Sequence, residues 1–360
     1  MASNLEENLG STVKFIQAES VQALASNFGA SSNEVPDRYI MPEVEADSVA
    51  QKGSFELPII DLAKLRDPQF SQAEIAKLGC ACGEWGFFQL INHGVDKELL
   101  ERVKADITAF FNLPLEQKKV VTTESNSAEG FGRQFVASDE QKLEWVDMLY
   151  LNTQPVNQRM LQVWPTNPPT FRDTIDQYSL ELNKVTGELL EAMSKDLGIE
   201  SDVLFNLFKE QPQVMRMNYY PPCPQPEKVL GASAHTDGAG LTLLLHVNDV
   251  QGLQIRKDNM WFNVENHPEA FVVNIGDILE IASNGRYPSV EHRAVVNTMK
   301  ERISIGTFQI PYRFCTVGPL PEVVRGGKEN YKSLPYIEYI KGYFSNKLKG
   351  RSYMESFKIY

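Results

Sequence analysis

Short apolar runs separated by turn residues fill the chain between residues 214 and 315. The runs are VMRMNYY, LTLLLHV, LQIRK, WFNV, AFVVNI, ILEIAS, AVVNT and RISIGTFQI. Each has the length and the β-branched or aromatic content of a strand, and Asn284-Gly285 between two of them is typical of a tight hairpin turn. Many short strands at regular spacing predict a β-sandwich or a jelly roll.

Helical spacing dominates the first 210 residues instead. Apolar residues recur at a helical period over 13–24, 71–102 and 96–114, although the aromatic, strand-like segment EWGFFQLINHG interrupts the second stretch. A further apolar stripe predicts a helix from Phe171 to Leu197, where Gly198 supplies a natural stop. We therefore expect helices to pack around the β-rich half.

Smaller elements complete the division of the chain. Strands are predicted at 56–62 and 142–151, a polar loop at TTESNSAEGFGRQF, and a helix from 335 to about 348. The fold class is therefore mainly β with flanking α. We divide the chain into an N-terminal helical arm (1–50), an α-rich region (51–210), the β core (211–315) and a helical tail (316–360).

Composition and charge exclude several classes of function. The net charge of −12 over 360 residues argues against a nucleic-acid partner, which needs clustered Lys and Arg. The acidic start, MASNLEENLG, is unlike a signal peptide, and the longest apolar runs are too short to span a membrane. Four cysteines without a CxxC pair suit a reducing compartment, so we expect a cytoplasmic protein. We also expect the protein to be a monomer.

The stretch GASAHTDGAGLTLLLHV places His235 and Asp237 two residues apart before an apolar run. On a strand, side chains at i and i+2 share a face about 6.6 Å apart, so both could contact one ion. A His-x-acid pair alone is weak evidence, as the pair His267-Pro268-Glu269 in a Pro-bearing turn illustrates. The other interpretation of His235 and Asp237 is two polar residues at the mouth of a strand.

A metal site needs a third ligand, and His292 is the candidate. It lies beyond the predicted hairpin, where the intervening strands can return to the same mouth of the fold. His246 ends an apolar strand and is better explained as a satisfied core histidine. Two histidines and one carboxylate leave half of an octahedral ion open, as in non-haem Fe(II) oxygenases; a catalytic zinc with the same ligands stays open.

A second cluster points to an anion. Arg302 and Ser304 share one strand face, and Asn218 and Tyr220 share a face of a neighbouring strand that Pro221 and Pro222 end. An inward guanidinium is costly unless an anion meets it, so these four side chains could cradle a small dicarboxylate. The alternative is an arginine on the surface of an edge strand.

Several segments together carry a resemblance that covers nearly the whole chain. They are LPIIDL, ACGEWGFFQLINHGV, FFNLPLEQK, WPTNPPTFRDTIDQYS, MNYYPPCPQP, HTDGAGLTLLL, GLQIRKDNMWFNV, VNIGDILEIASNG and SVEHRAVVNTMKERISIGTF. In this order they resemble the plant 2-oxoglutarate- and Fe(II)-dependent dioxygenases. VPDRYI and MRMNYYPPCPQP most resemble the senescence-related and alkaloid O-demethylase-like branch of that family.

The resemblance implies a fold, a set of cofactors and a reaction. The fold would be a double-stranded β-helix, a cupin-like jelly roll buttressed by helices. His235, Asp237 and His292 would bind Fe(II), while Arg302, Ser304 and Tyr220 would bind the distal carboxylate of 2-oxoglutarate. Asn218 would lie near the chelating end. With O₂ as the other co-substrate and ascorbate as reductant, the enzyme would hydroxylate, O-demethylate or desaturate its substrate at a C–H bond.

The same resemblance implies an aromatic substrate pocket. Its aromatic walls would be Phe308 and Tyr150, with Met148, Arg216 and Ile310 nearby. Phe131 and Phe135, on the glycine-flanked loop, could form a lid. Core packing is the competing explanation for each of these large side chains. We expect the partner to be a small aromatic molecule such as an alkaloid, a flavonoid or a coumarin.

Three other functions stay open at this point. A divalent-metal jelly-roll hydrolase or isomerase would share the His/Asp/His set but would not need Arg302 and Ser304 to face a dicarboxylate. An oxidase of the ethylene-forming type would use ascorbate in place of 2-oxoglutarate. A small-molecule receptor on the same fold would bind its ligand without consuming O₂.

Overall fold

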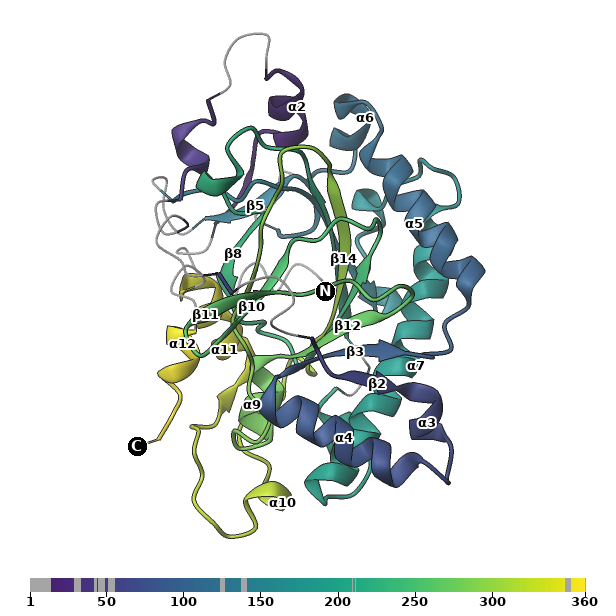
Figure 1. The fold of residues 1–360 in the computed structure, drawn as a ribbon, viewed down its shortest axis with the longest axis vertical. Coiled ribbons are helices and arrows are strands. Elements are labelled where there is room, and N and C mark those ends of the chain that lie inside the picture. The colour runs from purple at the N-terminus through teal and green to yellow at the C-terminus, as the bar shows by residue number, and fades with distance from the viewer. Residues whose placement is uncertain are drawn as a thin grey trace.

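The computed structural model contains two β-sheets that face each other, with helices around them (Figure 1). It describes residues 14–28, 34–41, 44, 49–50, 56–123, 127–136, 141–208, 210, 212–346 and 351–359. The N-terminal arm is therefore described only in part, and the predicted helix positions before residue 14 and after residue 346 lie outside these ranges.

The major sheet has eight strands in the order β2-β3-β12-β9-β14-β7-β6-β4. Its strands pair antiparallel except β2 with β3. Their bounds are Ile59–Asp61 (β2), Phe87–Ile91 (β3), Gly130–Phe131 (β4), Asp147–Gln154 (β6), Gln213–Tyr220 (β7), Leu241–His246 (β9), Phe271–Ile275 (β12) and Arg302–Gln309 (β14).

The minor sheet has four strands in the order β11-β10-β13-β8. They are Ala232–His235 (β8), Leu253–Lys257 (β10), Met260–Asn263 (β11) and His292–Ala294 (β13). From β8 to β14 the chain passes repeatedly between the two sheets, which makes the core a double-stranded β-helix, or jelly roll. Leu244 and Val272 of the major sheet meet Leu253 and Ile255 of the minor sheet in one apolar cluster between them.

Helices cover the outer face of the major sheet. The longest are α4 (Ser71–Glu84), α5 (Lys97–Phe111) and α7 (Phe171–Leu197), which lie together on one side of the molecule (Figure 1). The predicted stripe of α7, with Tyr178 and Leu182, is fully buried against outward-facing strand residues. Gly198 ends α7 at φ 69°, a left-handed conformation that glycine adopts without strain, as predicted.

Shorter helices connect and extend this frame. They are α2 (Val21–Ser26), α3 (Leu62–Arg66), α6 (Leu115–Lys119), α8 (Val203–Leu207), α9 (Asp277–Ala282), α10 (Pro321–Val324), α11 (Tyr336–Asn346) and α12 (Ser352–Glu355). The predicted C-terminal helix is confirmed as α11, which lies beside the minor sheet with α12 (Figure 1). A two-stranded sheet of β15 (Thr316–Val317) and β16 (Leu334–Pro335) precedes it.

Two segments of the first 140 residues differ from the prediction. Lys14–Gln17 is a strand, β1, where helical spacing predicted a helix. Its partner is β5 (Arg133–Val136), inside the segment predicted as a polar loop that also contains β4. Pairing between distant segments decides both conformations, and the local apolar period does not show it.

The run ILEIAS forms helix α9, so the predicted strand and its Asn284-Gly285 hairpin are wrong. Ile278 packs into the cluster of C-terminal tyrosines while Leu279 packs into the main core, which a short helix between two apolar layers permits. Asn284 and Gly285 do adopt positive φ values, 53° and 87°, but they follow the end of a helix. Short apolar runs of this kind are ambiguous between strand and helix.

Further features bear on the predicted class of protein. No helix within the described ranges is long and apolar enough to cross a membrane. Cys80, Cys82, Cys223 and Cys315 are free thiols. The predicted strand at 142–151 begins at Asp147 and continues to Gln154. The division of the chain at residues 50, 210 and 315 stays a prediction.

Candidate active site

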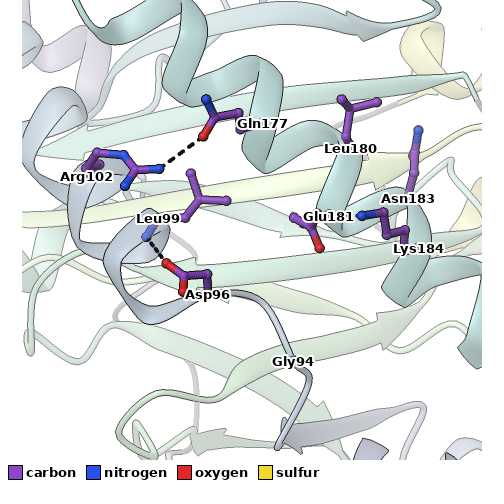
Figure 2. Close-up of a pocket in the computed structure, with 9 residues that line it drawn as sticks. All are labelled: Gly94, Asp96, Leu99, Arg102, Gln177, Leu180, Glu181, Asn183 and Lys184. Carbon is purple, nitrogen blue, oxygen red and sulfur yellow. Dashed lines mark hydrogen bonds and ion pairs between the residues drawn. The ribbon is translucent and has the colours of Figure 1, made fainter.

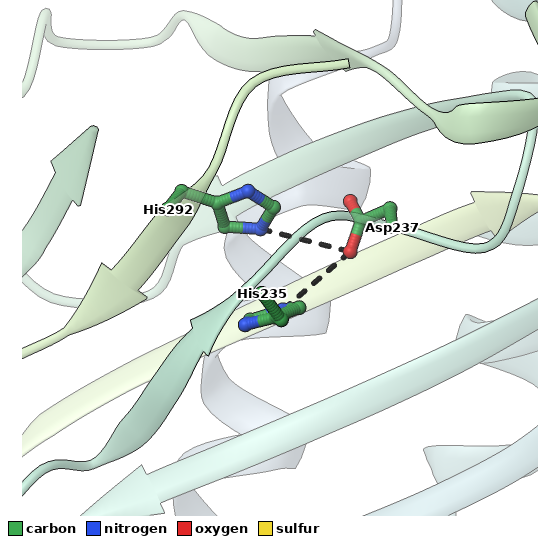
Figure 3. A group of neighbouring side chains, drawn as sticks. All are labelled: His235, Asp237 and His292. Atoms are coloured by element: carbon green, nitrogen blue, oxygen red, sulfur yellow. Dashed lines mark ion pairs between the residues drawn. The ribbon is translucent and has the colours of Figure 1, made fainter. Parts of the chain in front are cut away.

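His235 and His292 lie side by side on the minor sheet. They end β8 and begin β13, and the antiparallel register places them directly opposite each other, with ring centroids 4.4 Å apart. Asp237 follows β8 by two residues and turns its carboxylate toward both rings (Figure 3). Its Oδ1 lies 3.5 Å from Nε2 of His235 and 3.6 Å from Nε2 of His292, so three ligand atoms face one point.

Backbone carbonyls fix the orientation of both imidazoles. Nδ1 of His235 lies 2.6 Å from the Ser233 carbonyl, and Nδ1 of His292 lies 3.1 Å from the Val290 carbonyl. A carbonyl only accepts, so each Nδ1 carries a proton, and in the neutral ring the free lone pair then lies on Nε2. This is the tautomer that a metal ion needs, because ligating histidines donate their other ring N–H to an acceptor behind them.

Asp237 is held from behind in the same way. Its Oδ2 accepts hydrogen bonds from Thr242 Oγ1 at 2.6 Å and from Asn274 Nδ2 at 2.8 Å, which leaves Oδ1 free to face the same point as the two Nε2 atoms. Sequence analysis missed both partners, because Thr242 lies on β9 and Asn274 on β12. Only the pairing of these strands, which places the two residues opposite each other, reveals them.

The electrostatics favour the metal-binding protonation states. Burial alone would raise the pKa of the Asp237 carboxyl, but His292, His235 and Thr242 lower it well below its usual range. Burial lowers the pKa of His292 to about 4. An ionised carboxylate and a neutral imidazole are therefore present at neutral pH, and these are the forms that bind divalent metal ions.

The remaining histidines lie outside this cluster. Among the described residues, no other group of three His, Cys, Asp or Glu side chains is arranged to share an ion. His267 is exposed on its turn, as predicted. His93 is buried and contacts the carbonyl of Glu269. His246 differs from the predicted satisfied core histidine, since neither of its buried ring nitrogens has a hydrogen-bond partner.

Arg302, Ser304, Asn218 and Tyr220 come together on the inner face of the major sheet. Strands β14 and β7 pair so that Arg302 lies opposite Tyr220 and Ser304 opposite Asn218. The guanidinium carbon of Arg302 lies 5.1 Å from the Tyr220 ring centroid, and one of its terminal nitrogens lies 3.3 Å from Ser304 Oγ. The predicted cluster thus forms one continuous polar cradle.

This cradle holds more hydrogen-bonding capacity than the protein satisfies. Arg302 is only 3% exposed, its Nε has no partner, and no acidic side chain of the described residues pairs with it. Asn218 Oδ1 is also buried without a partner. A buried guanidinium without a carboxylate costs several kcal/mol, roughly, unless a ligand supplies the anion. The cradle therefore fits a small molecule that carries a carboxylate.

Two glycines shape the cradle, and sequence analysis did not single them out. A Cβ at Gly252 would lie 2.8 Å from Cδ of Arg302, and one at Gly231 would lie 2.5 Å from Cδ1 of Tyr220. Side chains at these positions would displace the guanidinium or the phenol. The signal in the sequence was a glycine just before each strand, in VQGLQ and LGASAH.

Most of the predicted substrate residues share the inner face. Met148 lies opposite Asn218, and Tyr150 opposite Arg216, whose Nη2 donates to Glu144 Oε2 at 3.1 Å. Phe308 follows Ser304 along the same face of β14. Ile310 comes directly after β14, where its N–H donates to the Pro212 carbonyl.

The two predicted lid residues lie in different parts of the fold. Phe131 lies opposite Leu149, and both belong to the outer core, where the Phe131 ring meets that of Phe110 at 5.9 Å. Phe131 therefore packs for stability and does not face the site, because β4 places it on the outer face of the sheet. Phe135 lies opposite Phe15 in the β1-β5 pair, and its side chain is outside the described part of the structure.

The C-terminal helix also reaches the site, which sequence analysis did not foresee. Tyr343 of α11 donates its hydroxyl to the Thr236 carbonyl at 2.8 Å, between the two metal-ligand candidates of the first segment. Its ring lies against Gly238, where a Cβ would come within 3.1 Å. The neighbouring Phe344 contacts Phe15 of β1, so α11 also touches the N-terminal strand.

An open cleft elsewhere has a different character. It occupies about 670 Å³ between α5 and α7, on the helical layer outside the major sheet (Figure 2). Its polar groups largely satisfy one another, as Arg102 does with Gln177 and Lys184 with Glu181. It lacks the convergent unpaired groups of the inner face, so we assign it no chemistry.

Fold and site together define a class of protein: a jelly-roll enzyme with a mononuclear metal centre and an acidic co-substrate. Residues 211–311 match the profile of the 2OG-Fe(II) oxygenase superfamily. Residues 57–167 match that of the non-haem dioxygenase in morphine synthesis N-terminal region. The structure is similar to the crystal structure of JOX2 in complex with 2OG, Fe and JA, with a TM-score of 0.86, 36% identity and coverage of 95% of this chain and 98% of that chain.

Curated relatives agree with these matches. The chain is 47% identical to 2-oxoglutarate-dependent dioxygenase 11 of Oryza sativa subsp. japonica, over 97% of this chain and 98% of that protein. It is 42% identical to oxoglutarate-dependent flavonoid 7-O-demethylase 1 of Ocimum basilicum, over 96% and 92%. The chain belongs to the 2OG-Fe(II) oxygenase superfamily and is a 2-oxoglutarate-dependent dioxygenase. The relatives support this function and not the hydrolase, isomerase or ascorbate-dependent alternatives.

Proposed function

We propose that the chain oxidises a C–H bond of an aromatic or hydrophobic plant specialised metabolite, such as an alkaloid, a flavonoid or a coumarin, by hydroxylation or O-demethylation. The observation that carries the proposal is the convergence of two sets of polar side chains on adjoining inner faces of one jelly roll. One is the His235–Asp237–His292 cluster, and the other is the cradle around Arg302. The flavonoid demethylase among the relatives supports the substrate class.

His235, Asp237 and His292 would hold Fe(II). The donor set fits this ion, because two imidazoles and one carboxylate on one side leave positions open for other ligands. Iron bound there supplies the redox chemistry that activates dioxygen. The protein's own part is to keep each Nε2 and Asp237 Oδ1 aimed at one point, through the carbonyls of Ser233 and Val290 and the side chains behind Asp237.

Arg302, Ser304 and Tyr220 would bind the distal carboxylate of 2-oxoglutarate, with Asn218 nearer the chelating end. The unpaired guanidinium supports this assignment, because a carboxylate would accept two of its N–H groups and the Ser304 hydroxyl would add a third donor. Burial of the cradle strengthens these bonds by excluding water.

The substrate would lie against Phe308, Tyr150, Met148, Arg216 and Ile310. Aromatic walls favour a ring, and the Arg216–Glu144 pair offers both a donor and an acceptor for a polar substituent. Holding the target C–H in one orientation is the main contribution that such a pocket makes to rate. Phe135 as a lid, a cytosolic location, a monomeric state and ascorbate as the reductant stay predictions.

The test is an anaerobic incubation of the full chain with Fe(II), 2-oxoglutarate and a library of plant aromatic metabolites, followed by admission of O₂ and mass spectrometry. We expect one compound to gain an oxygen atom or to lose a CH₂ unit, with one succinate released per turnover. Product formed before O₂ enters would indicate a hydrolase or isomerase. Turnover without succinate would indicate an ascorbate-dependent oxidase.

A further inference from the structure

His246 is the last residue of β9, and the two nitrogens of its imidazole are buried without a hydrogen-bond partner. A buried polar atom without a partner costs about 1–3 kcal/mol. Most buried polar groups in native proteins are satisfied, so an exception calls for an explanation. The ring takes no part in the metal centre, which is built from other strands.

The strand register places His246 beside the co-substrate cradle. Ser304 of β14 lies between two partners, with His246 of β9 opposite it on one side and Asn218 of β7 on the other. Side chains directly opposite each other in antiparallel strands share a face, with Cβ atoms about 4.5–5.5 Å apart. Asn218, Ser304 and His246 therefore form one row across the inner face, next to Arg302.

The unsatisfied atoms of this row gather in one place. Nδ1 and Nε2 of His246, Nε of Arg302 and Oδ1 of Asn218 are all buried and all lack partners. Burial, and then the positive charge of Arg302, lower the pKa of His246 to about 3, so the ring is neutral at physiological pH. A neutral imidazole has one N–H to donate, and the guanidinium beside it offers no acceptor. The imidazole of His246 and the guanidinium of Arg302 therefore both need an acceptor, and a negatively charged one suits the guanidinium.

We propose that His246 is a further recognition residue for 2-oxoglutarate, whose ring N–H donates a hydrogen bond to the distal carboxylate beside Arg302 and Ser304. The inference rests on the proposed function of the cradle and adds a fourth donor to it. A purely space-filling role would be served equally by an apolar side chain of similar size, and the two roles make opposite predictions for ligand binding.

The first experiment measures 2-oxoglutarate binding without turnover, by calorimetry on the full chain loaded with Mn(II). We expect His246→Leu to weaken 2-oxoglutarate binding about 10- to 100-fold, the effect of one hydrogen bond to a charged group. His246→Gln keeps an N–H donor, so its affinity for 2-oxoglutarate should stay within about 3-fold of the wild-type value. Mn(II) affinity should not change in either variant.

A ligand lacking the distal carboxylate separates recognition from structure. 2-Oxopentanoate has the same five-carbon chain with a methyl group in place of that carboxylate, so His246→Leu should leave its weak binding unchanged. His93→Leu is a matched control, because His93 is another buried histidine but its Nε2 contacts the Glu269 carbonyl, outside the cradle. It should not alter 2-oxoglutarate affinity.

Three outcomes would overturn the inference. They are wild-type affinity in His246→Leu, an equal loss for 2-oxoglutarate and 2-oxopentanoate, or a loss in His246→Gln as large as in His246→Leu. If His246→Leu does not fold, ¹⁵N-histidine spectra of the zinc-loaded wild type decide, since the His246 N–H signal should move with 2-oxoglutarate and not with 2-oxopentanoate. A wild type that binds no 2-oxoglutarate would instead refute the proposed function itself.

Discussion

The two faces of the major sheet are built from alternate residues of the same strands, yet their side chains have different surroundings. On the outer face, Ile303 and Ile305 of β14 are buried with Leu243 and Leu245 of β9 against the helical layer. On the inner face of the same two strands, Arg302 and His246 retain polar atoms without a hydrogen-bond partner.

This difference teaches how one strand serves stability and function at once. The outer residues contribute apolar burial, which is the main favourable term in folding. The inner residues are kept polar at a cost, and ligands recover that cost when they bind. Because successive side chains point to opposite faces, changes on one face should leave the other largely unaffected. The following substitutions test that separation.

The largest effect is expected from removing a metal ligand. His235→Ala should no longer bind Fe(II). Its activity should fall by more than ~100-fold, the upper value for losing a residue that only supports a ligand, because here the ligand itself is removed. Metal content by elemental analysis and succinate release measure this. The free energy of unfolding of the metal-free variant should lie within about 1 kcal/mol of that of metal-free wild type, because His235 lies outside the main core. A variant that still binds iron stoichiometrically would contradict the assignment.

A crossed pair on β14 tests the comparison directly. Ile305→Ala should lower the free energy of unfolding by about 2–5 kcal/mol, through the cavity left in the outer core, without changing 2-oxoglutarate affinity. Its neighbour Ser304→Ala should weaken 2-oxoglutarate binding about 10-fold with little change in stability. Denaturant unfolding and calorimetry measure the two quantities. If both variants changed both quantities, the two faces would not be independent.

The residues behind Asp237 should matter less than the ligands themselves. Asn274→Ala removes the donor to Asp237 Oδ2, which lies 2.8 Å away, and should weaken metal binding about 10- to 100-fold. Competition with a metal chelator gives the affinity. Asn263→Ala, on β11 of the minor sheet, is a control, since its side chain contacts Gln254 and not the metal cluster. Equal losses in both variants would contradict a specific role for Asn274.

The unusual state of His246 predicts a pH dependence. Its folded pKa is lowered to about 3, against about 6.5 in an unfolded chain, so the unfolded chain binds more protons between these values. This contribution to metal-free stability is complete above about pH 6.5 and is lost as the pH falls toward 3. Burial also lowers the pKa of His292 to about 4, with the same sign, and raises the pKa of Asp277 to about 7, with the opposite sign, so the raw curve mixes all three groups.

The difference between wild type and His246→Gln isolates the histidine. The wild type should lose stability more steeply on acidification, by at most about 1.4 kcal/mol per pH unit, the value for one proton. Urea unfolding of the metal-free proteins at several pH values provides the measurement. Parallel curves would show that His246 is not held neutral by its surroundings.

The smallest effect is expected in the outer cleft. Arg102→Ala in the cleft between α5 and α7 removes a hydrogen bond to Gln177 and should change stability by less than about 0.5 kcal/mol. Affinity for 2-oxoglutarate and turnover should be unchanged. A clear loss of turnover would mean that the helical layer contributes to the reaction.

Local patterns were enough to identify much of the site. The i, i+2 spacing of His235 with Asp237, and of Arg302 with Ser304, put each pair on one face before any strand partner was known. The stripe on Phe171–Leu197 likewise predicted the long helix that covers the outer face. These features depend only on backbone geometry over a few residues.

Other features depend on which strands pair, and no local pattern contains that information. Phe131 packs outward because β4 aligns it with Leu149, and Lys14–Gln17 is a strand because β5 lies beside it. Short apolar runs such as ILEIAS satisfy strand and helix patterns alike, so packing between two apolar layers decided the helix.

The sequence by itself determined the chemical groups, their faces and the resemblance to a family of dioxygenases. The tertiary structure decided which groups support one another: Thr242 and Asn274 behind Asp237, Gly252 beside Arg302, and His246 without a partner. The physical reason is the separation along the chain of the residues involved. Side-chain direction repeats every two residues along a strand, whereas hydrogen-bond partners come from strands that only folding brings together.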